Sequence, residues 1–311
     1  MRHRPCPFCC SESLSVFGTR EDLWVRCRSC RSVFRDITAD RFEDLHGGAF
    51  QDSHFVDSIV ATNGLEPASA LWEKLALPGR SILEIGPGCG HLLAAARKAG
   101  RSVTAVESSE VHRTFIRETW DINSLYEDVA AIPPGLLFDA IVAINVLEHI
   151  YDIVGFLSVV TRGLASGGVL FMSTVNAASL EAALLRNWWS MCKEHDHVSF
   201  PSPAGMARVA QTIGLDTERI WSTELPFELP VSALVAARDW SRARRGPSIT
   251  ANDDHPAGPV EGGGASSKAR LGRFYSMSAN FDPTSRLLGA LGRAATVKAR
   301  LRPGAPLAIG D

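Results

Sequence analysis

The middle of the chain alternates short apolar runs with amphipathic segments. Apolar runs of strand length lie at 81–85, 103–107, 138–144 and 169–174, and a further strand is predicted at 215–223. Helices are predicted between them, at 91–97 and about 153–164. Strands that alternate with helices in this way predict an α/β fold with a doubly wound, mainly parallel sheet.

The flanking segments predict further helices and one linker. Short helices are indicated at 41–46 and 55–60, and longer ones at 231–245 and about 284–301. Residues 246–267 are rich in Gly and Pro, a composition that buries too little apolar surface to order itself. The last helix carries leucines together with arginines. It can rest on an anionic membrane or on another subunit, or pack on its own core with the arginines in solvent.

Composition excludes several classes of protein. The chain has 311 residues, of which 45% are hydrophobic and 21% charged, and such a chain can bury a core without disulfides. Its longest apolar stretch, 138–147, is interrupted by Asp139 and Asn145 and is too short for a membrane span. Because the first residues also lack the apolar run of a secretory signal, we expect a cytoplasmic protein.

The formal net charge of −2 hides an asymmetry along the chain. From Ala236 onward twelve Lys and Arg stand against six Asp and Glu, so residues 1–235 are acidic as a whole. Residues 1–36 are nevertheless basic, with seven Arg against four acids. A dedicated nucleic-acid binder is disfavoured, whereas a local basic face at either end stays open.

Four of the seven cysteines have the spacing of a zinc site. Two residues separate Cys6 from Cys9 and Cys27 from Cys30, and seventeen residues lie between the two pairs. Each short spacer lets one turn direct two sulfurs at a common metal, and a hairpin brings the two turns together. Four thiolates close the coordination shell, so the zinc would be structural. Disulfides are the competing interpretation, disfavoured by the absence of a secretion signal.

A glycine-rich loop follows the first strand of the predicted sheet. Gly86, Gly88 and Gly90 stand before the helix at 91–97, where glycines permit a tight turn and let a ligand approach the backbone amides. Glu107 ends the next strand, 21 residues after Gly86, and a carboxylate there can bind both hydroxyls of a ribose. The sequence therefore predicts a nucleotide site.

This loop resembles motif I of the class I S-adenosylmethionine-dependent methyltransferases. Glu84 completes the pattern Glu-x-Gly-x-Gly-x-Gly, and His91 stands where dinucleotide binders place a third Gly or Ala. In that family the loop wraps the amino-acid part of the cofactor. The resemblance covers about 75–225, with Asp128 aligned to the acceptor for the adenine amino group. It implies that the cofactor contacts are Glu84, Gly86, Gly88, Gly90, Glu107, Asp128, Val129 and Asn145.

Two further segments are similar to a subgroup that contains quinone-biosynthesis O-methyltransferases and many natural-product and glycan methyltransferases. They are the run 146–149, Val-Leu-Glu-His, and the run 194–200, Glu-His-Asp-His-Val-Ser-Phe. Quinone O-methyltransferases tend to carry Glu-x-x-Glu-His after the fourth strand, which can gather a divalent cation. Because Asn145 replaces the first acid, a catalytic metal is not expected here.

The resemblance implies a domain organisation. A zinc ribbon is expected at 1–38, a helical linker or lid at 39–74, a Rossmann-like methyltransferase core at 75–225, and a helical C-terminal extension at 226–311. The antiparallel last strand that such a core normally contains is not recognisable in the C-terminal sequence.

Histidines near the carboxyl edge of the predicted sheet are candidates for a general base. A hydroxyl that accepts a methyl group loses its proton, and an imidazole with a pKa of about 6.5 is suited to take it. The candidates are His149, His195 and His197, each of which can instead be a structural residue. Glu148 either orients a histidine or caps the following helix.

Three functions remain open. An O-methyltransferase acting on a small molecule or glycan is favoured by the motifs, and Trp188 and Trp189 either line its pocket or pack in its core. An RNA methyltransferase that uses the ribbon to recognise its substrate is the alternative, although the run 145–148 is not the Asn/Asp-Pro-Pro-aromatic motif of enzymes that methylate exocyclic amines. A non-catalytic scaffold is the third, and the intact cofactor loop argues against it.

Overall fold

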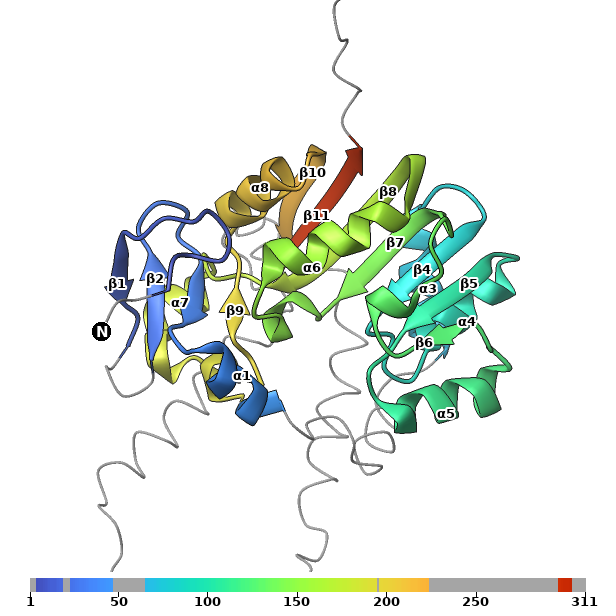
Figure 1. The fold of residues 1–311 in the computed structure, drawn as a ribbon, viewed down its shortest axis with the longest axis horizontal. Helices are drawn as coiled ribbons and strands as arrows, with labels where there is room; N and C mark the ends of the chain where they lie inside the picture. The colour runs from blue at the N-terminus through green and yellow to red at the C-terminus, as the bar shows by residue number, and fades with distance from the viewer. Residues whose placement is uncertain (1–3, 19–22, 47–64, 195, 224–295, 304–311) are drawn as a thin grey trace, which may run out of the picture.

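The computed structural model describes residues 4–18, 23–46, 65–194, 196–223 and 296–303. They form a large α/β unit and a smaller cysteine-bearing unit beside it (Figure 1). The predicted helices at 55–60 and 231–245 and the linker at 246–267 lie outside the described residues. None of the helices that the structure describes is long and apolar enough to cross a membrane.

A seven-stranded sheet forms the centre of the α/β unit, in the order β10-β11-β8-β7-β4-β5-β6. Five neighbouring strands pair in parallel, and β11 is antiparallel to both of its neighbours. The strands are β4 (Ser81–Ile85), β5 (Ser102–Val106), β6 (Leu125–Tyr126), β7 (Phe138–Ile144), β8 (Leu164–Val175), β10 (Leu215–Thr223) and β11 (Thr296–Pro303). The strand order reverses between β4 and β7, which makes their carboxyl ends the expected ligand crevice.

Helices cover both faces of this sheet because alternate residues of a strand point to opposite sides. On one face Leu83 and Ile141 pack in the cluster that contains α6 and α8, and on the other Ile82 and Val142 pack with α3 and α4. The α-helices of the unit are α3 (Leu65–Leu75), α4 (His91–Lys98), α5 (Glu110–Trp120), α6 (Ile153–Val160), α7 (Leu180–Leu185) and α8 (Pro203–Thr212). Its 3-10 turns are η1 (Val129–Ala131), η2 (Leu147–His149), η3 (Thr161–Gly163), η4 (Arg186–Trp188) and η5 (Ser190–Lys193).

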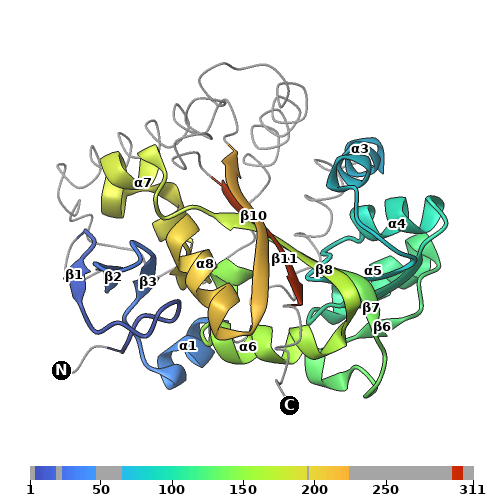
Figure 2. The same cartoon turned by 90° about the horizontal axis from the view of Figure 1, so that it is seen from above.

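The cysteine-bearing unit contains a second and smaller sheet. We call its residues, 4–18 and 23–46, the cysteine module. Its own strands are β1 (Leu14–Val16), β2 (Trp24–Cys27) and β3 (Val33–Arg35), followed by helix α1 (Ala39–His46). The fourth strand, β9 (Ser199–Phe200), comes from the chain that leads into α8. Figure 2 shows β1, β2 and β3 beside α7 and α8. The module is therefore joined to the α/β unit by a shared sheet.

The predicted helix at 284–301 is wrong in the part that the structure describes. Residues 296–303 form β11, between β8 and β10. Val297, Ala299 and Leu301 are fully buried and alternate with less buried residues, which is the period of a strand. The antiparallel last strand is thus present, and the core extends beyond the predicted boundary at residue 225. The basic residues of this stretch also do not form a membrane-facing helix, since Arg300 and Arg302 contact Glu218 on β10.

The position of Leu301 gives a test of the strand assignment. Leu301→Ala should lower the free energy of unfolding by about 2–5 kcal/mol, because it leaves a cavity in the main core. Urea unfolding followed by circular dichroism measures this loss. Arg302→Ala on the same strand is the control and should cost about 1 kcal/mol or less, since its ion pair is partly exposed. Equal losses in the two variants would contradict the register of β11.

Candidate active site

The predicted glycine loop lies at the carboxyl end of β4. Gly86, Gly88 and Gly90 have φ angles of 64°, 54° and 72°, a region in which a side chain is strained. A Cβ added to Gly86 would stand 2.7 Å from Val146 Cγ2, whereas one added to Gly88 would meet nothing within 4 Å. The loop therefore packs against the residues after β7 at Gly86, and its backbone is open to a ligand at Gly88.

Two carboxylates border this loop. The Oε2 atom of Glu107 accepts a hydrogen bond from Gly88 N (3.1 Å), and its Oε1 atom accepts one from Ser109 N (2.9 Å). Glu84, on β4, is buried, and burial together with the charge of Glu107 raises its pKa to about 8. A buried acid beside a second carboxylate favours a ligand that carries positive charge.

The other predicted cofactor residues lie at the ends of neighbouring strands. Asp128 follows β6 and caps η1, where its Oδ1 atom accepts a hydrogen bond from Ala130 N (2.7 Å). Val129 is partly buried against the main core. Asn145 follows β7 in a left-handed conformation (φ 54°), which asparagine tolerates better than most residues. Parallel strands thus bring all the predicted cofactor contacts to one edge of the sheet.

A pair formed by His149 and Asp196 lies beside this edge. His149 closes η2 after β7, and its Nδ1 atom is 3.3 Å from Asp196 Oδ2. The ring of His197 stands edge-on to that of His149, with centroids 4.9 Å apart, and its Nδ1 atom lies 3.0 Å from the carbonyl oxygen of Met191. The structure thus brings two of the three predicted histidines together, and His195 lies outside the described residues.

Electrostatics divide the roles within this cluster. Burial opposes protonation of His149, but the hydrogen bond to Asp196 and the charge of Glu148 outweigh it and raise the pKa of the imidazole. Burial also opposes ionisation of Asp196, yet the contact with His149 lowers the pKa of that carboxyl to about 2. For His197, burial and the charge of His149 lower the pKa to about 4. His149 is the stronger base of the two.

Glu148 is buried beneath the pair. It is 2% exposed, its Oε2 atom accepts a hydrogen bond from Thr174 Oγ1 (2.6 Å), and burial raises its pKa. The cap of α6 is Asp152, so the alternative that Glu148 caps this helix is wrong. Donor atoms of Glu148, His149 and His197 lie within 4.8 Å of one another, a separation that a cation can bridge. In the structure Thr174 and the carbonyl of Met191 contact two of these groups.

The two tryptophans differ in their surroundings. Trp189 is 1% exposed, donates from Nε1 to Glu181 Oε2 (3.3 Å) and packs against Phe200 with centroids 5.0 Å apart. It is a core residue. Trp188 is half-buried, and the ammonium of Lys193 lies 5.4 Å from its ring centre.

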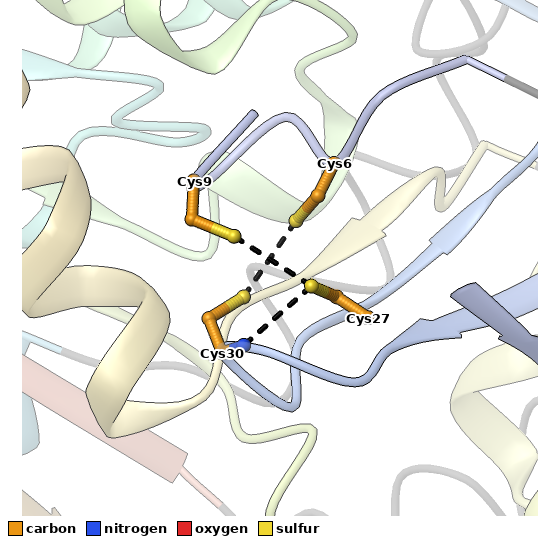
Figure 3. Close-up of side chains that lie close together, drawn as sticks. All are labelled: Cys6, Cys9, Cys27 and Cys30. Carbon is orange, nitrogen blue, oxygen red and sulfur yellow. Dashed lines mark hydrogen bonds between the residues drawn. The ribbon is translucent and has the colours of Figure 1, made fainter. Parts of the chain in front are cut away.

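The four paired cysteines converge on one point (Figure 3). The Sγ atoms of Cys6 and Cys30, and those of Cys9 and Cys27, are 3.6 Å apart. A disulfide needs about 2.05 Å. Zn–S bonds of about 2.3 Å in a tetrahedron place sulfurs about 3.8 Å apart. Burial raises the pKa of Cys9 to about 11, so a nearby cation is needed to keep its thiolate. The donor set and its spacing fit zinc.

Asp196 is a candidate functional residue that was not predicted from the sequence. Its signal was present, because an acid that stands between two histidines at 195 and 197 can pair with an imidazole and fix its tautomer. Which histidine it contacts depends on the fold, since His149 lies 47 residues earlier in the chain.

Comparisons with known proteins agree with this geometry. A family model described as "Methyltransferase domain" matches residues 49–220, more than half of the chain. The chain belongs to the class I S-adenosylmethionine-dependent methyltransferases. Their Rossmann-like fold, a mainly parallel sheet between helices, is the one seen here.

Two named relatives support this assignment, and one solved structure supports the fold. The ubiquinone biosynthesis O-methyltransferase of Thiobacillus denitrificans is 30% identical over 173 residues, which are 50% of this chain and 74% of the relative. That of Xanthomonas campestris is 32% identical over 120 residues, 36% of this chain and 49% of the relative. A methyltransferase structure from Archaeoglobus fulgidus shares the fold, with a TM-score of 0.50, 13% identity, and coverage of 80% of this chain and 99% of the other.

The position of Glu107 predicts its role in this methyltransferase. Glu107→Gln should weaken binding of S-adenosylhomocysteine by about tenfold to a hundredfold, because hydrogen bonds that a charged carboxylate accepts are lost. Isothermal titration calorimetry measures the dissociation constant. Glu110→Gln is the matched control, since Glu110 is exposed and pairs with Arg113 on α5. An unchanged constant in the Glu107 variant would remove Glu107 from the cofactor site.

Proposed function

We propose that this methyltransferase transfers the methyl group of S-adenosylmethionine to a hydroxyl of a small molecule or glycan, with His149 as the general base. The observation that carries the proposal is the pair of His149 and Asp196, in which His149 follows by three residues the Val146 that borders Gly86 of the glycine loop. The relatives are named O-methyltransferases of ubiquinone biosynthesis, and that name supports the same acceptor chemistry.

The cofactor supplies a methyl group already activated by the positive charge of its sulfonium. We infer that Glu84 and Glu107 balance the cationic groups of the cofactor and that Glu107 binds the ribose hydroxyls. Gly88 leaves room for the cofactor to approach the backbone, and Asp128 accepts from the adenine amino group. Asn145 and Val129 complete the contact surface from the ends of β7 and β6.

His149 has the geometry of an oriented base. Its Nδ1 atom lies toward Asp196, which favours the tautomer with a proton on Nδ1 and a lone pair on Nε2. Nε2 then takes the proton of the acceptor hydroxyl, and Asp196 stabilises the imidazolium that forms, the division of roles found in the Ser-His-Asp triad. His197, whose pKa is lower, packs against this ring as a neutral neighbour, and the buried Glu148 adds negative charge.

Three arginines of the cysteine module disfavour the RNA alternative. Arg4 lies 4.1 Å from the ring centre of Tyr151, Arg26 lies 4.5 Å from that of Phe17, and Arg35 lies 5.0 Å from that of Trp24. Such stacking commits their charge to contacts inside the protein. Three of the seven arginines of residues 1–36 therefore have a structural explanation, and a small acceptor is the better proposal.

The proposed base predicts a defined kinetic loss. His149→Ala should lower kcat by about 10²–10⁴-fold while the KM for S-adenosylmethionine changes little, because only the proton acceptor is removed. Because the pKa of His149 is raised and the neutral ring is the active form, the wild-type rate should fall as the pH is lowered through a value above about 6.5. The assay follows transfer from tritium-labelled cofactor to catechol and to the small-molecule fraction of a cell extract.

Asp196→Asn supplies the companion measurement. Without the carboxylate the pKa of His149 falls, so the acid limb of the pH profile should move to lower pH and the plateau rate should drop. Glu194→Gln, an exposed acid two residues earlier, is the control and should leave the profile unchanged. Full activity in His149→Ala together with loss in His195→Ala would transfer the role to His195.

We also propose that Cys6, Cys9, Cys27 and Cys30 hold one structural zinc ion. Elemental analysis of purified protein should find one zinc per chain. The double variant Cys27→Ser with Cys30→Ser should lose it, because two ligands cannot close the shell. Cys10→Ser should keep it, since Cys10 is exposed and stands outside the cluster. Zinc retained in the double variant would refute this site.

A further inference from the structure

The cysteine module lies directly against the segment that carries Asp196 and His197. We call residues 190–194 and 196–202 the histidine segment. Its end forms β9, which pairs antiparallel with β3, so that Val33 faces Phe200 and Phe34 faces Ser199. The module therefore supplies a backbone template for the end of this segment.

Arg35 holds the histidine segment at two points. Its backbone N donates to the carbonyl oxygen of Val198 (2.9 Å), and its Nη2 atom donates to that of Glu194 (2.8 Å). These two carbonyls stand on either side of Asp196 and His197 in the sequence. The guanidinium lies against the ring of Trp24, which limits its own movement. Arg35 thus holds both ends of the short stretch that contacts His149.

Trp24 fixes the segment from a second direction. Its indole Nε1 atom donates to the carbonyl oxygen of Cys192 (3.3 Å), and its ring stacks on Phe200 with centroids 4.8 Å apart and planes 12° from parallel. It is 1% exposed. Ser202 adds a third attachment, because its hydroxyl donates to the carbonyl oxygen of Cys30, which is itself one of the four clustered cysteines.

The other side of the segment contacts the loop after β7. Val198 N donates to the carbonyl oxygen of Glu148 (2.7 Å), and Ser199 Oγ donates to that of Leu147 (2.7 Å). The histidine segment is therefore enclosed between the cysteine module and η2, which carries His149. A displacement of the module would therefore change the distance between Asp196 and His149.

We propose that the cysteine module is a metal-dependent positioning element of the acceptor site, in which Arg35 and Trp24 hold the histidine segment so that Asp196 meets His149. The general-base role of His149 belongs to the proposed function on which this inference builds, whereas the positioning itself does not require it. Arg35 and Trp24 are positioning residues and touch neither cofactor nor acceptor in this scheme.

The proposed metal site is linked to these two residues because two of its cysteines lie with them on the hairpin of β2 and β3. Trp24 and Cys27 begin and end β2, and Cys30 stands five residues before Arg35 on β3. The β2–β3 hairpin thus carries both cysteines at its turn, so closing the metal shell fixes it. Loss of the metal releases the hairpin and with it both attachments.

Hydrogen exchange on the full chain tests the positioning without an acceptor substrate. In Arg35→Ala the amides of residues 190–202 should exchange about tenfold faster than in the wild type, as expected for the loss of one hydrogen bond from a charged donor. Chelation of the metal should have a larger effect on the same peptide. Peptides that cover 82–107 should be unchanged, and the affinity for S-adenosylhomocysteine should stay within about twofold.

Arg28→Ala is the matched control. Arg28 is exposed on the same module and donates from Nε to the carbonyl oxygen of Leu14, inside the module, so exchange at 190–202 should equal that of the wild type. Arg35→Lys should give an intermediate rate, because an ammonium can reach a carbonyl but lacks the planar fork that stacks on Trp24. Zinc content should stay at the wild-type level in all three arginine variants.

A spectroscopic measurement separates positioning from a general loss of stability. In protein labelled with ¹⁵N-histidine, the imidazole signal missing from His149→Ala reports the tautomer of His149. Arg35→Ala should shift this signal toward the values of an unpaired imidazole while the circular dichroism spectrum stays unchanged.

The outcomes distinguish this inference from the proposed function. Unchanged exchange at 190–202 and an unchanged imidazole signal, in Arg35→Ala and after chelation, would overturn the positioning role and leave His149 as the base. Full activity of His149→Ala combined with faster exchange in Arg35→Ala would overturn the base and leave the positioning role in place.

Discussion

The pairing of β3 with β9 is the interaction on which the arrangement of the acceptor side depends. It is only two residue pairs long, yet it joins the N-terminal cysteine module to a segment about 165 residues later in the sequence. A pairing this short is weak alone. Here it is reinforced by the stacking of Trp24 on Phe200 and by a small apolar cluster that includes Val33, Trp189 and Cys192. The cluster excludes water from the backbone hydrogen bonds around it.

The cofactor side depends on a different principle, the placement of negative charge at one sheet edge. Parallel strands deliver Glu84 and Glu107 to neighbouring carboxyl ends, where burial makes ionisation of Glu84 costly. In the proposed function a cationic cofactor would relieve that cost, and part of its binding energy would come from charges that the fold has already brought together. The acceptor side instead contains an imidazole and a carboxylate that satisfy each other. The two halves of the site therefore balance their charges separately.

Features that depend on residues close together in the sequence could be predicted, and contacts between distant residues could not. The loop from Gly86 to Gly90 and the strand ends at Glu107 and Asn145 are local features, and the structure places them at one edge as expected. The strand at 215–223 was likewise readable from its pattern. The strand at 296–303 was missed because the leucines before it suggested a helix, although apolar residues alternate there with period two. The partnership of His149 with Asp196 and the bond from Arg35 to Glu194 are long-range contacts that no local pattern encodes.

The pairing of β10 with β11 has a consequence for how this chain can change in evolution. Thr223 and Thr296 are direct partners, and their hydroxyl oxygens lie 2.8 Å apart, so residues 224–295 begin and end at adjacent points of one antiparallel pair. A short turn could close the same hairpin. Closing it with 72 residues costs only about 2–3 kcal/mol more in loop-closure entropy than closing it with a turn of about four residues. The junction is therefore a site where sequence can be inserted or exchanged at low cost to the sheet. It is located at the carboxyl end of β8, where Thr296 pairs with Val175, so inserted sequence would start from the same edge of the sheet as the glycine loop.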